Sequence, residues 1–234
     1  MSETTIAVTI PAFDAEATVG EVVRRALPVA REVLVVDDGS QDRTAEVARD
    51  AGARVLRHER NLGKGRALRT AFGDLFERGH DAVATLDADG QHLPEDLPKL
   101  LAARLQGADL VLGTRDHLFG DMYGVRRVSN RWSSYLIATL AGAPLPDVQS
   151  GFRIYARRLI ERAGFPEPRF EAESAVVIRA ARLGFGIVGV PIELGFADGR
   201  CTSHYRPIID SVRIALAVSR ARLETVGCQL ERYS

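Results

Sequence analysis

The stretch Ala82-Val83-Ala84-Thr85-Leu86-Asp87-Ala88-Asp89-Gly90-Gln91-His92-Leu93-Pro94-Glu95-Asp96 is the most informative part of the chain. An apolar run ends at two carboxylates spaced two residues apart, and Gln91 follows two residues later. A strand that stops at Asp87 presents that carboxylate at the carboxyl edge of a sheet, where open α/β folds bind ligands. A few hard oxygen atoms suit Mg²⁺ or Mn²⁺ that shares its coordination shell with substrate phosphates. An ordinary surface turn explains the same residues equally well.

Strand-like and helix-like segments alternate on both sides of this stretch. The expected strands are 6–10, 33–36, 53–56, 82–86 and 110–112, and the expected helices are 15–27, 44–51, 64–78 and 95–106. Such alternation with short connections predicts an α/β fold, with a mostly parallel central sheet and helices on both faces. Right-handed crossovers place the strand ends at one edge, so the polar residues of 11–14, 37–40, 87–91 and 113–115 should converge there.

The second part of the chain has longer helices and fewer strands. We expect helices at 126–141, 171–183 and 207–224, a loop at 144–151 and a strand at 186–194. Because there is no repeat, low-complexity stretch or clear linker, we predict one domain over residues 1–234, Rossmann-like, with two halves that meet at about residue 115.

Composition is that of an ordinary globular protein, with 46% hydrophobic and 26% charged residues. Lys plus Arg and Asp plus Glu both number 31, and this balance argues against bulk nucleic-acid binding. Two cysteines without metal-type spacing, Cys201 and Cys228, suit a reducing cytoplasm. The first residues have no secretory pattern, and no window reaches the roughly 18 apolar residues that span a bilayer, so we expect a cytoplasmic protein.

Two further segments indicate nucleotide binding. Asp37 and Asp38 follow an apolar run, and adjacent carboxylates that repel each other favour hydrogen bonding to a nucleobase or a ribose. For Ser40 and Asp42 we favour capping of the next helix. Residues 61–65, Asn-Leu-Gly-Lys-Gly, open a helix whose N-terminus could attract phosphate, although a simple helix start is as good an explanation. They lack the Walker A spacing, and no GxGxxG follows the first strand.

These segments together resemble glycosyltransferase family 2, which has the GT-A fold, and in particular its dolichol-phosphate mannose synthase and polyprenyl-phosphate glycosyltransferase branch. The similarity is carried, in the family's order, by residues 8–16, 35–40, 61–65, 86–92 and 150–153. The Asp-x-Asp-x-Gln pattern with a downstream Ser-Gly-Phe-Arg is the most specific part. The chain departs from the branch at Phe13-Asp14, at Gln149 and at Cys201-Thr202-Ser203-His204, where the branch has Tyr-Asn, Thr or Ser, and Gly-x-Ser-Lys.

The resemblance implies a role for each matching residue. Nucleotide-sugar binding falls to Pro11, Ala12, Phe13, Asp14, Asp37, Asp38, Lys64, Asp87 and Ala88. The metal ligands, for Mg²⁺ or Mn²⁺, are Asp87, Asp89 and Gln91. The catalytic residues are Asp89, Arg115 and Arg131. The acceptor is held by Arg115, Arg131, Ser150, Arg153, Ser203, His204 and Arg206. The first half would then bind the donor, and the second half, with its amphipathic last helix, the acceptor.

The implied reaction is a metal-dependent, inverting hexosyl transfer from a GDP- or UDP-sugar to a polyprenyl phosphate. A lipid phosphate is already anionic, whereas a hydroxyl acceptor needs a base, for which Asp147, Glu171 and Glu173 are the candidates. The basic, amphipathic helix expected at 207–224 could lie on the inner face of a membrane or pack on the core. A membrane-anchoring partner protein is an alternative route to the lipid.

Two other classes of protein share part of this pattern. Residues 33–38 resemble the acidic start of a receiver-like signalling module, but a full β-α unit precedes them and no lysine ends the strand at Leu112. A sugar-nucleotide nucleotidyltransferase has a similar sheet, but it needs a glycine-rich, basic loop after the first strand, and Pro11-Ala12-Phe13-Asp14 is neither. A glycosyltransferase therefore explains the sequence better than either alternative.

Overall fold

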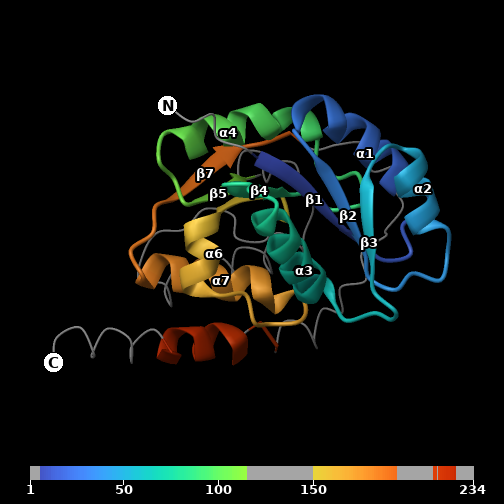
Figure 1. Ribbon diagram of the computed structural model, residues 1–234. Coiled ribbons are helices and arrows are strands. Elements are labelled where there is room, and N and C mark those ends of the chain that lie inside the picture. Colours follow the sequence, from blue (N-terminus) through green and yellow to red (C-terminus); the bar gives the residue numbers. More distant parts are fainter. Residues whose placement is uncertain (1–5, 115–149, 194–212, 215, 225–234) are drawn as a thin grey trace, which may run out of the picture.

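A single sheet organises the computed structural model of the chain, which describes residues 6–114, 150–193, 213–214 and 216–224. The strands are β1 (Ile6–Ala12), β2 (Val33–Asp37), β3 (Arg54–Arg57), β4 (Ala82–Thr85), β5 (Leu110–Thr114), β6 (Arg153–Ala156) and β7 (Ile187–Pro191). Their order across the sheet is β3-β2-β1-β4-β6-β5-β7. β6 runs antiparallel to both of its neighbours, and every other pairing is parallel. The predicted mostly parallel sheet is confirmed (Figure 1).

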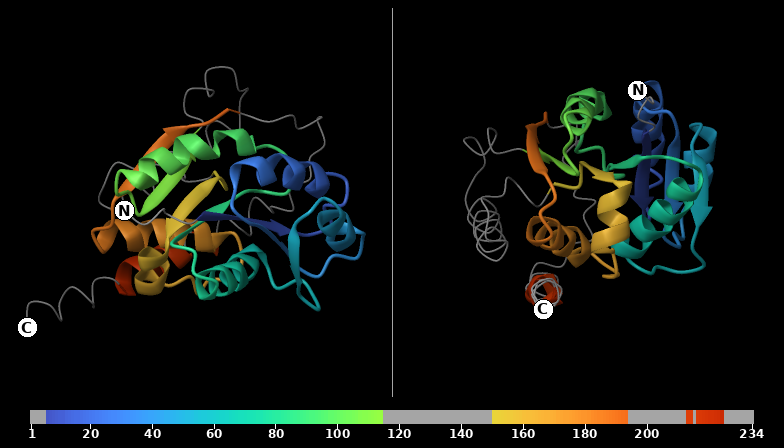
Figure 2. Two further views of the ribbon diagram at one scale, coloured as in Figure 1. Left: turned by 45° about the horizontal axis from the view of Figure 1, so that its top comes forward. Right: turned by 60° about the vertical axis from the view of Figure 1, so that its left-hand side comes forward.

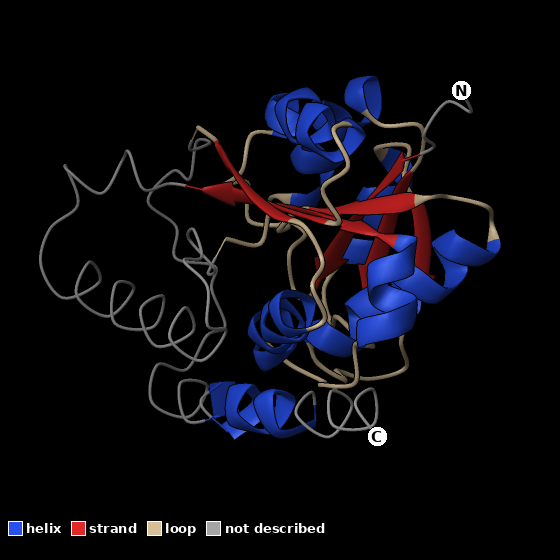
Figure 3. Cartoon of the chain, turned by 90° about the vertical axis from the view of Figure 1, so that its left-hand side faces the viewer, coloured by secondary structure: helices blue, strands red, loops and turns tan. Residues whose placement is uncertain are grey.

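Helices cover both faces of this sheet, as the sequence predicted. Their bounds are α1 (Val19–Ala26), α2 (Thr44–Asp50), α3 (Lys64–Glu77), α4 (Leu97–Leu105), α6 (Arg157–Ala163) and α7 (Glu171–Arg182), with 3₁₀ turns at Leu27–Val29 and Pro94–Asp96. α1, α2 and α4 pack on one face of the sheet, and α3, α6 and α7 pack on the other (Figures 2 and 3). β1, β2 and β5, which are almost entirely buried, are accordingly near-continuous apolar runs.

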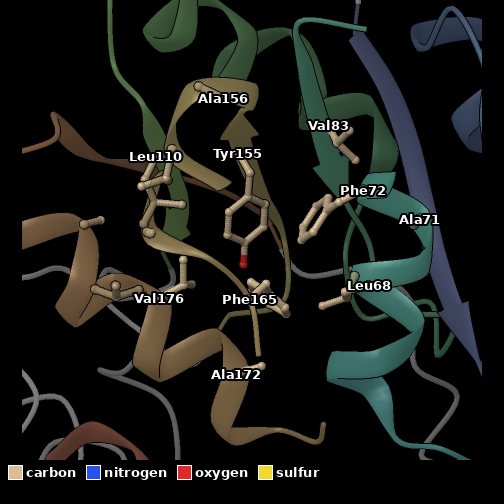
Figure 4. Close-up of a cluster of buried hydrophobic side chains, with 14 of the residues drawn as sticks. Leu68, Ala71, Phe72, Val83, Leu110, Tyr155, Ala156, Phe165, Ala172 and Val176 are labelled. Atoms are coloured by element: carbon tan, nitrogen blue, oxygen red, sulfur yellow. The ribbon is translucent and has the colours of Figure 1, made fainter. Parts of the chain in front are cut away.

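An aromatic cluster fills the core beneath α3. The ring of Phe72 lies 5.2 Å from that of Tyr155 and 5.2 Å from that of Phe165, both in edge-to-face geometry (Figure 4). The helical spacing of Ala67, Leu68, Ala71, Phe72 and Leu75 predicted this apolar face, and all five are buried. Burial raises the pKa of the Tyr155 phenol to about 12. The buried cluster joins α3 to strands from both parts of the chain.

The sequence reading was wrong in some details. It ended the first strand at Pro11, whereas β1 continues to Ala12; β4 ends opposite Thr9, so a proline at position 11 costs no bond to that neighbour. No element was predicted for residues 157–163, which form α6. Arg157 donates to the carbonyls of Phe76 and His80 at the end of α3.

The helix expected at 207–224 is described only in part. Residues 216–224 are helical, and Val218 and Ala221 pack into the core on the α7 side, whereas Leu216 and Leu223 are exposed. Glu224 lies 3.5 Å from the Arg179 guanidinium of α7. Figures 1 and 2 show this segment beside α7. The helix expected at 126–141 lies outside the described residues, and the division at about residue 115 stays a prediction.

Candidate active site

A cavity of about 480 Å³ opens where the predicted loops converge, beyond the carboxyl ends of β1, β2 and β4. Most of its lining comes from the loops after these strands and from the start of α3. The lining residues are Pro11, Ala12, Phe13, Asp14, Ala15, Thr18, Asp38, Asn61, Gly63, Lys64, Ala67, Asp87, Ala88, Asp89, Arg169, Phe170 and Arg213. Of the nine predicted nucleotide-sugar residues, only Asp37 does not line it.

The loops after β1 and β2 hold each other in place. The Asp14 amide donates to the Ser40 hydroxyl oxygen at 2.9 Å, and the Gln41 amide donates to the Asp14 carboxylate at 2.9 Å. The Asp42 carboxylate accepts the amide and hydroxyl of Thr44 at the start of α2, whereas the N-cap residue of this helix is Arg43. Ser40, which was also expected to cap, instead binds the first loop. These hydrogen bonds between the two loops hold the cavity wall that runs from Pro11 to Asp14.

The two adjacent aspartates after β2 have different surroundings. Asp37 is fully buried; its carboxylate accepts the Ser40 amide at 2.9 Å and lies 3.1 Å from the Arg57 guanidinium. Asp38 lines the cavity, and its carboxylate accepts the amides of Leu62 and Gly63. Asp37 is therefore placed to shape the turn, and Asp38 is the one that can meet a ligand.

Lys64 stands between two acidic groups at the first turn of α3. Its ammonium lies 2.6 Å from the Asp87 carboxylate and 2.8 Å from the Glu173 carboxylate of α7. Burial on its own lowers the pKa of the Lys64 ammonium, but the charges of these two carboxylates outweigh it and hold the pKa above its usual range. Lys64 is thus a fixed positive charge at the edge of the predicted metal site.

We expect Lys64→Met to lower the free energy of unfolding by about 3 kcal/mol, because two largely buried carboxylates would lose their shared counter-charge. Urea denaturation monitored by circular dichroism measures this change. Lys99→Met is the matched control: its ammonium pairs with Asp96 at 2.6 Å but is 54% exposed, so about 1 kcal/mol or less should be lost. Equal losses in the two variants would contradict the expectation.

The predicted metal ligands follow β4. Asp87 and Asp89 line the cavity. The backbone amide of Gln91 donates to the Asp89 carboxylate at 3.0 Å, which closes the turn. Burial first, and then the charge of Asp87, raises the pKa of the Asp89 carboxyl above its usual range, while the Gln91 amide acts in the opposite direction. Gln91 itself does not line the cavity.

The acidic side chains at this point suit a metal that also binds the substrate. No group of three or more His, Cys, Asp or Glu side chains among the described residues could hold a metal by itself. Mg²⁺ and similar ions commonly use one or two carboxylates and take their other ligands from water and substrate phosphates. Asp87 and Asp89 would supply the hard oxygens for such an ion, and Lys64 already places one positive charge against Asp87.

The segment 150–153 lies against Asp87 because β6 is antiparallel to β4, so that its start meets the end of β4. A methyl group on Gly151 would lie 2.2 Å from an Asp87 carboxylate oxygen, and the Gly151 carbonyl accepts the Thr85 hydroxyl at 2.7 Å. Nδ1 of His92 lies 3.8 Å from the Asp87 carboxylate, and its Nε2 lies 3.4 Å from the Ser150 hydroxyl. Only glycine leaves room for this carboxylate.

Two of the predicted acceptor residues, Ser150 and Arg153, are buried and do not line the cavity. The Arg153 guanidinium donates to the carbonyls of Ser150 at 2.7 Å and Glu173 at 2.6 Å. This arrangement ties the start of β6 to α7, which carries the acidic partner of Lys64. The other predicted acceptor and catalytic residues lie outside the described residues: Arg115, Arg131, Ser203, His204 and Arg206. The candidate base Asp147 lies outside them too.

Eight residues of the cavity wall were not predicted as site residues: Ala15, Thr18, Asn61, Gly63, Ala67, Arg169, Phe170 and Arg213. Arg169 and Phe170 come just before α7, and the ring of Phe170 lies 6.0 Å from the Lys64 ammonium. Gly63 abuts this segment, since a methyl group there would lie 2.5 Å from the Pro168 carbonyl oxygen. The pattern of 61–65 indicated a close approach but not which partner approaches. Arg213 belongs to the segment 207–224, for which only a basic, amphipathic helix was predicted.

Within the described residues, no helix is both long and apolar enough to cross a bilayer. The exposed Leu216 and Leu223 share the helical segment 216–224 with exposed Arg220 and Arg222.

Known proteins are similar to this chain in sequence and in fold. The family described as "Glycosyl transferase family 2" matches residues 7–164. An undecaprenyl-phosphate mannosyltransferase of Micrococcus luteus is 36% identical over 181 residues, which are 73% of this chain and 74% of the relative. A polyprenol monophosphomannose synthase of Mycolicibacterium smegmatis is 30% identical over 176 residues, 68% of this chain and 65% of the relative.

Among solved structures, glucosyl-3-phosphoglycerate synthase of Mycobacterium tuberculosis, in complex with Mn²⁺, uridine diphosphate and glucosyl-3-phosphoglycerate, superposes with a TM-score of 0.72. It is 26% identical, and the match covers 97% of this chain and 81% of that one. This likeness confirms the expected GT-A fold, and the relatives confirm the resemblance to the polyprenyl-phosphate glycosyltransferase branch. The chain belongs to glycosyltransferase family 2 and is a glycosyltransferase.

Proposed function

We propose that this enzyme transfers a hexosyl group from a nucleotide-diphosphate sugar to a polyprenyl phosphate, with inversion at the anomeric carbon. One observation carries the proposal: one cavity combines the loop from Pro11 to Asp14, together with Asp38, and a charged end formed by Lys64, Asp87 and Asp89. The polyprenyl-phosphate acceptor is supported by the names of the two bacterial relatives.

The charged end suits a sugar diphosphate that leaves as the new bond forms. Mg²⁺ or Mn²⁺ held by Asp87 and Asp89 would supply positive charge to the departing diphosphate. Lys64, already fixed by two carboxylates, adds a second positive charge on the same side. An acceptor phosphate oxygen is anionic near neutral pH, so it attacks the anomeric carbon without giving up a proton. Arg115 and Arg131 are proposed to position that phosphate through two-pronged hydrogen bonds.

A hydroxyl acceptor is the second candidate, and it is favoured by the surroundings of Glu173. Glu173 is 7% exposed, and one of its carboxylate oxygens accepts no hydrogen bond from any described residue. Its other oxygen contacts Lys64, which lines the cavity although Glu173 itself does not. An acceptor hydroxyl that reached the first oxygen would meet a base there. The structural neighbour is described with a glucosyl-3-phosphoglycerate product rather than a lipid phosphate.

The deciding experiment offers UDP- and GDP-sugars to the enzyme with undecaprenyl phosphate, with 3-phosphoglycerate, or with neither, and measures released nucleoside diphosphate. We expect release that depends on divalent metal and on the lipid phosphate. Release that depends only on 3-phosphoglycerate would replace the lipid proposal with the second candidate. No acceptor-dependent release with any donor would contradict both of them.

Glu173→Gln separates the two acceptor classes by a second route. If the acceptor is a phosphate, turnover should stay within about tenfold of the natural enzyme, because the amide oxygen still accepts from Lys64 and no base is needed. If the acceptor is a hydroxyl, loss of the base should cost about 10²–10⁴-fold. Steady-state turnover, with calorimetric donor affinity as the control for binding, distinguishes these outcomes.

A further inference from the structure

Asp38 makes three hydrogen bonds within the protein before any ligand arrives. One carboxylate oxygen accepts the Leu62 amide at 2.9 Å and lies 2.7 Å from Nδ1 of His58, and the other accepts the Gly63 amide at 2.7 Å. A carboxylate has about four lone-pair positions, so these contacts leave about one for a ligand. Since Asp38 is only 3% exposed but lines the cavity, its neighbours decide where that last position points.

His58 connects this carboxylate to α3. Its Nε2 lies 3.0 Å from the Thr70 hydroxyl, while its Nδ1 faces an oxygen that already accepts an amide. Nδ1 must therefore carry a proton, and the Thr70 hydroxyl can donate to Nε2 or accept from it as needed. The His58 side chain is 12% exposed and does not line the cavity, so a ligand there would meet Asp38 and not the imidazole.

The contacts close a ring that includes the start of α3. They run from Thr70 to His58, from His58 to Asp38, and from Asp38 to the amides of Leu62 and Gly63. The next residue, Lys64, begins α3 and bridges the carboxylate of Asp87, in the charged end of the cavity, and that of Glu173 on α7. The His58 imidazole thereby contacts the Asp38 carboxylate directly and, through it, the loop that leads to Lys64.

We propose that His58 is a positioning residue for the nucleotide half of the donor: by donating through Nδ1 it fixes the Asp38 carboxylate and the 61–63 loop in their binding arrangement. This inference rests on the proposed function, because it assumes that a nucleoside diphosphate occupies the cavity. A residue with this role should affect donor binding and donor KM much more than kcat.

Two amide substitutions test which ring nitrogen matters. The amide nitrogen of asparagine can occupy the place of Nδ1, whereas that of glutamine reaches the place of Nε2, so His58→Asn keeps the donor to Asp38 and His58→Gln loses it. In calorimetric titrations with UDP and with GDP, we expect His58→Asn to bind within about twofold of the natural protein and His58→Gln about tenfold more weakly. Donor KM should follow the same order, with kcat nearly unchanged.

A second variant and a second measurement keep the test decisive if His58→Gln is unstable. Thr70→Val removes one support of the ring at constant volume, and its nucleotide affinity should lie between those of the two His58 variants. In ¹⁵N spectra of the ligand-free protein, the Leu62 and Gly63 amide resonances should move in His58→Gln and stay in place in His58→Asn. Matching spectra for the two variants would overturn the proposal whether or not a nucleotide binds.

The result also separates this inference from the proposed function. If the natural protein binds UDP or GDP and His58→Gln binds as tightly, the positioning role is wrong and the transferase proposal stands. If the natural protein binds neither nucleotide, the transferase proposal fails, and the amide spectra alone decide whether His58 braces Asp38.

Discussion

Asp89→Asn is expected to lower turnover by at least about a hundredfold while leaving the fold intact. The substitution removes a negative charge from the two carboxylates that line the charged end of the cavity, and a bound metal contributes several kcal/mol of charge stabilisation. The fold should survive because the side chain belongs to a loop after β4 and not to the core. Released nucleoside diphosphate reports turnover, and thermal unfolding reports stability.

Asp50→Asn is the matched control, since it makes the same chemical change at an exposed position at the end of α2. It should retain full turnover. Mn²⁺ binding, followed by the electron paramagnetic resonance signal of the free ion in the presence of nucleoside diphosphate, gives a measurement that does not need activity. Full turnover of Asp89→Asn, or of the natural enzyme in excess chelator, would rule out the metal assignment.

Gly151→Ala is the second substitution for which we expect a large loss, of about a hundredfold in turnover. The new methyl group would lie 2.2 Å from one carboxylate oxygen of Asp87 and 2.7 Å from the other. Because Lys64 holds this carboxylate at 2.6 Å, any displacement also disturbs the charged end of the cavity. Steady-state kinetics with the donor identified by the screen measures the effect.

Gly73→Ala provides the comparison for this substitution. Gly73 lies within α3, and a methyl group there meets no atom within 4 Å, so this variant should be neutral or more stable by about 0.5–1 kcal/mol. Nearly natural turnover of Gly151→Ala would mean that the position of Asp87 does not matter for catalysis.

Much of the fold was predictable because its signals are local. Apolar runs marked β1, β2, β4 and β5, and the helical spacing in 64–78 marked the buried face of α3. The convergence of Pro11–Asp14, Asp38, Asp87 and Asp89 followed from parallel strands whose carboxyl ends share an edge. These residues lie near each other because of strand direction, which a repeated β-α pattern largely determines.

The remaining parts depend on contacts between distant segments, which leave little trace in a single sequence. Nothing in the local pattern of Lys64 shows that Glu173 lies beside it, and an aspartate buried by packing, such as Asp37, looks the same as one that faces a cavity. Likewise Arg169 resembles any surface arginine until its segment packs against Gly63. For residues 61–65 the sequence alone could not show that Gly63 packs against the segment before α7.

The antiparallel β6 has a consequence for how the protein is made. β5 follows β4 in the chain, but the two are separated in the sheet by β6. When only residues 6–114 have left the ribosome, β4 and β5 are present but β6, which lies between them, is not. The unpaired edges of such strands can pair with other chains. β4 and β5 become part of one sheet only after residues 153–156 have been synthesised and have paired with both of them. This long-range pairing should slow folding. Expression of residues 6–114 alone should accordingly give an aggregating fragment instead of a separate nucleotide-binding module.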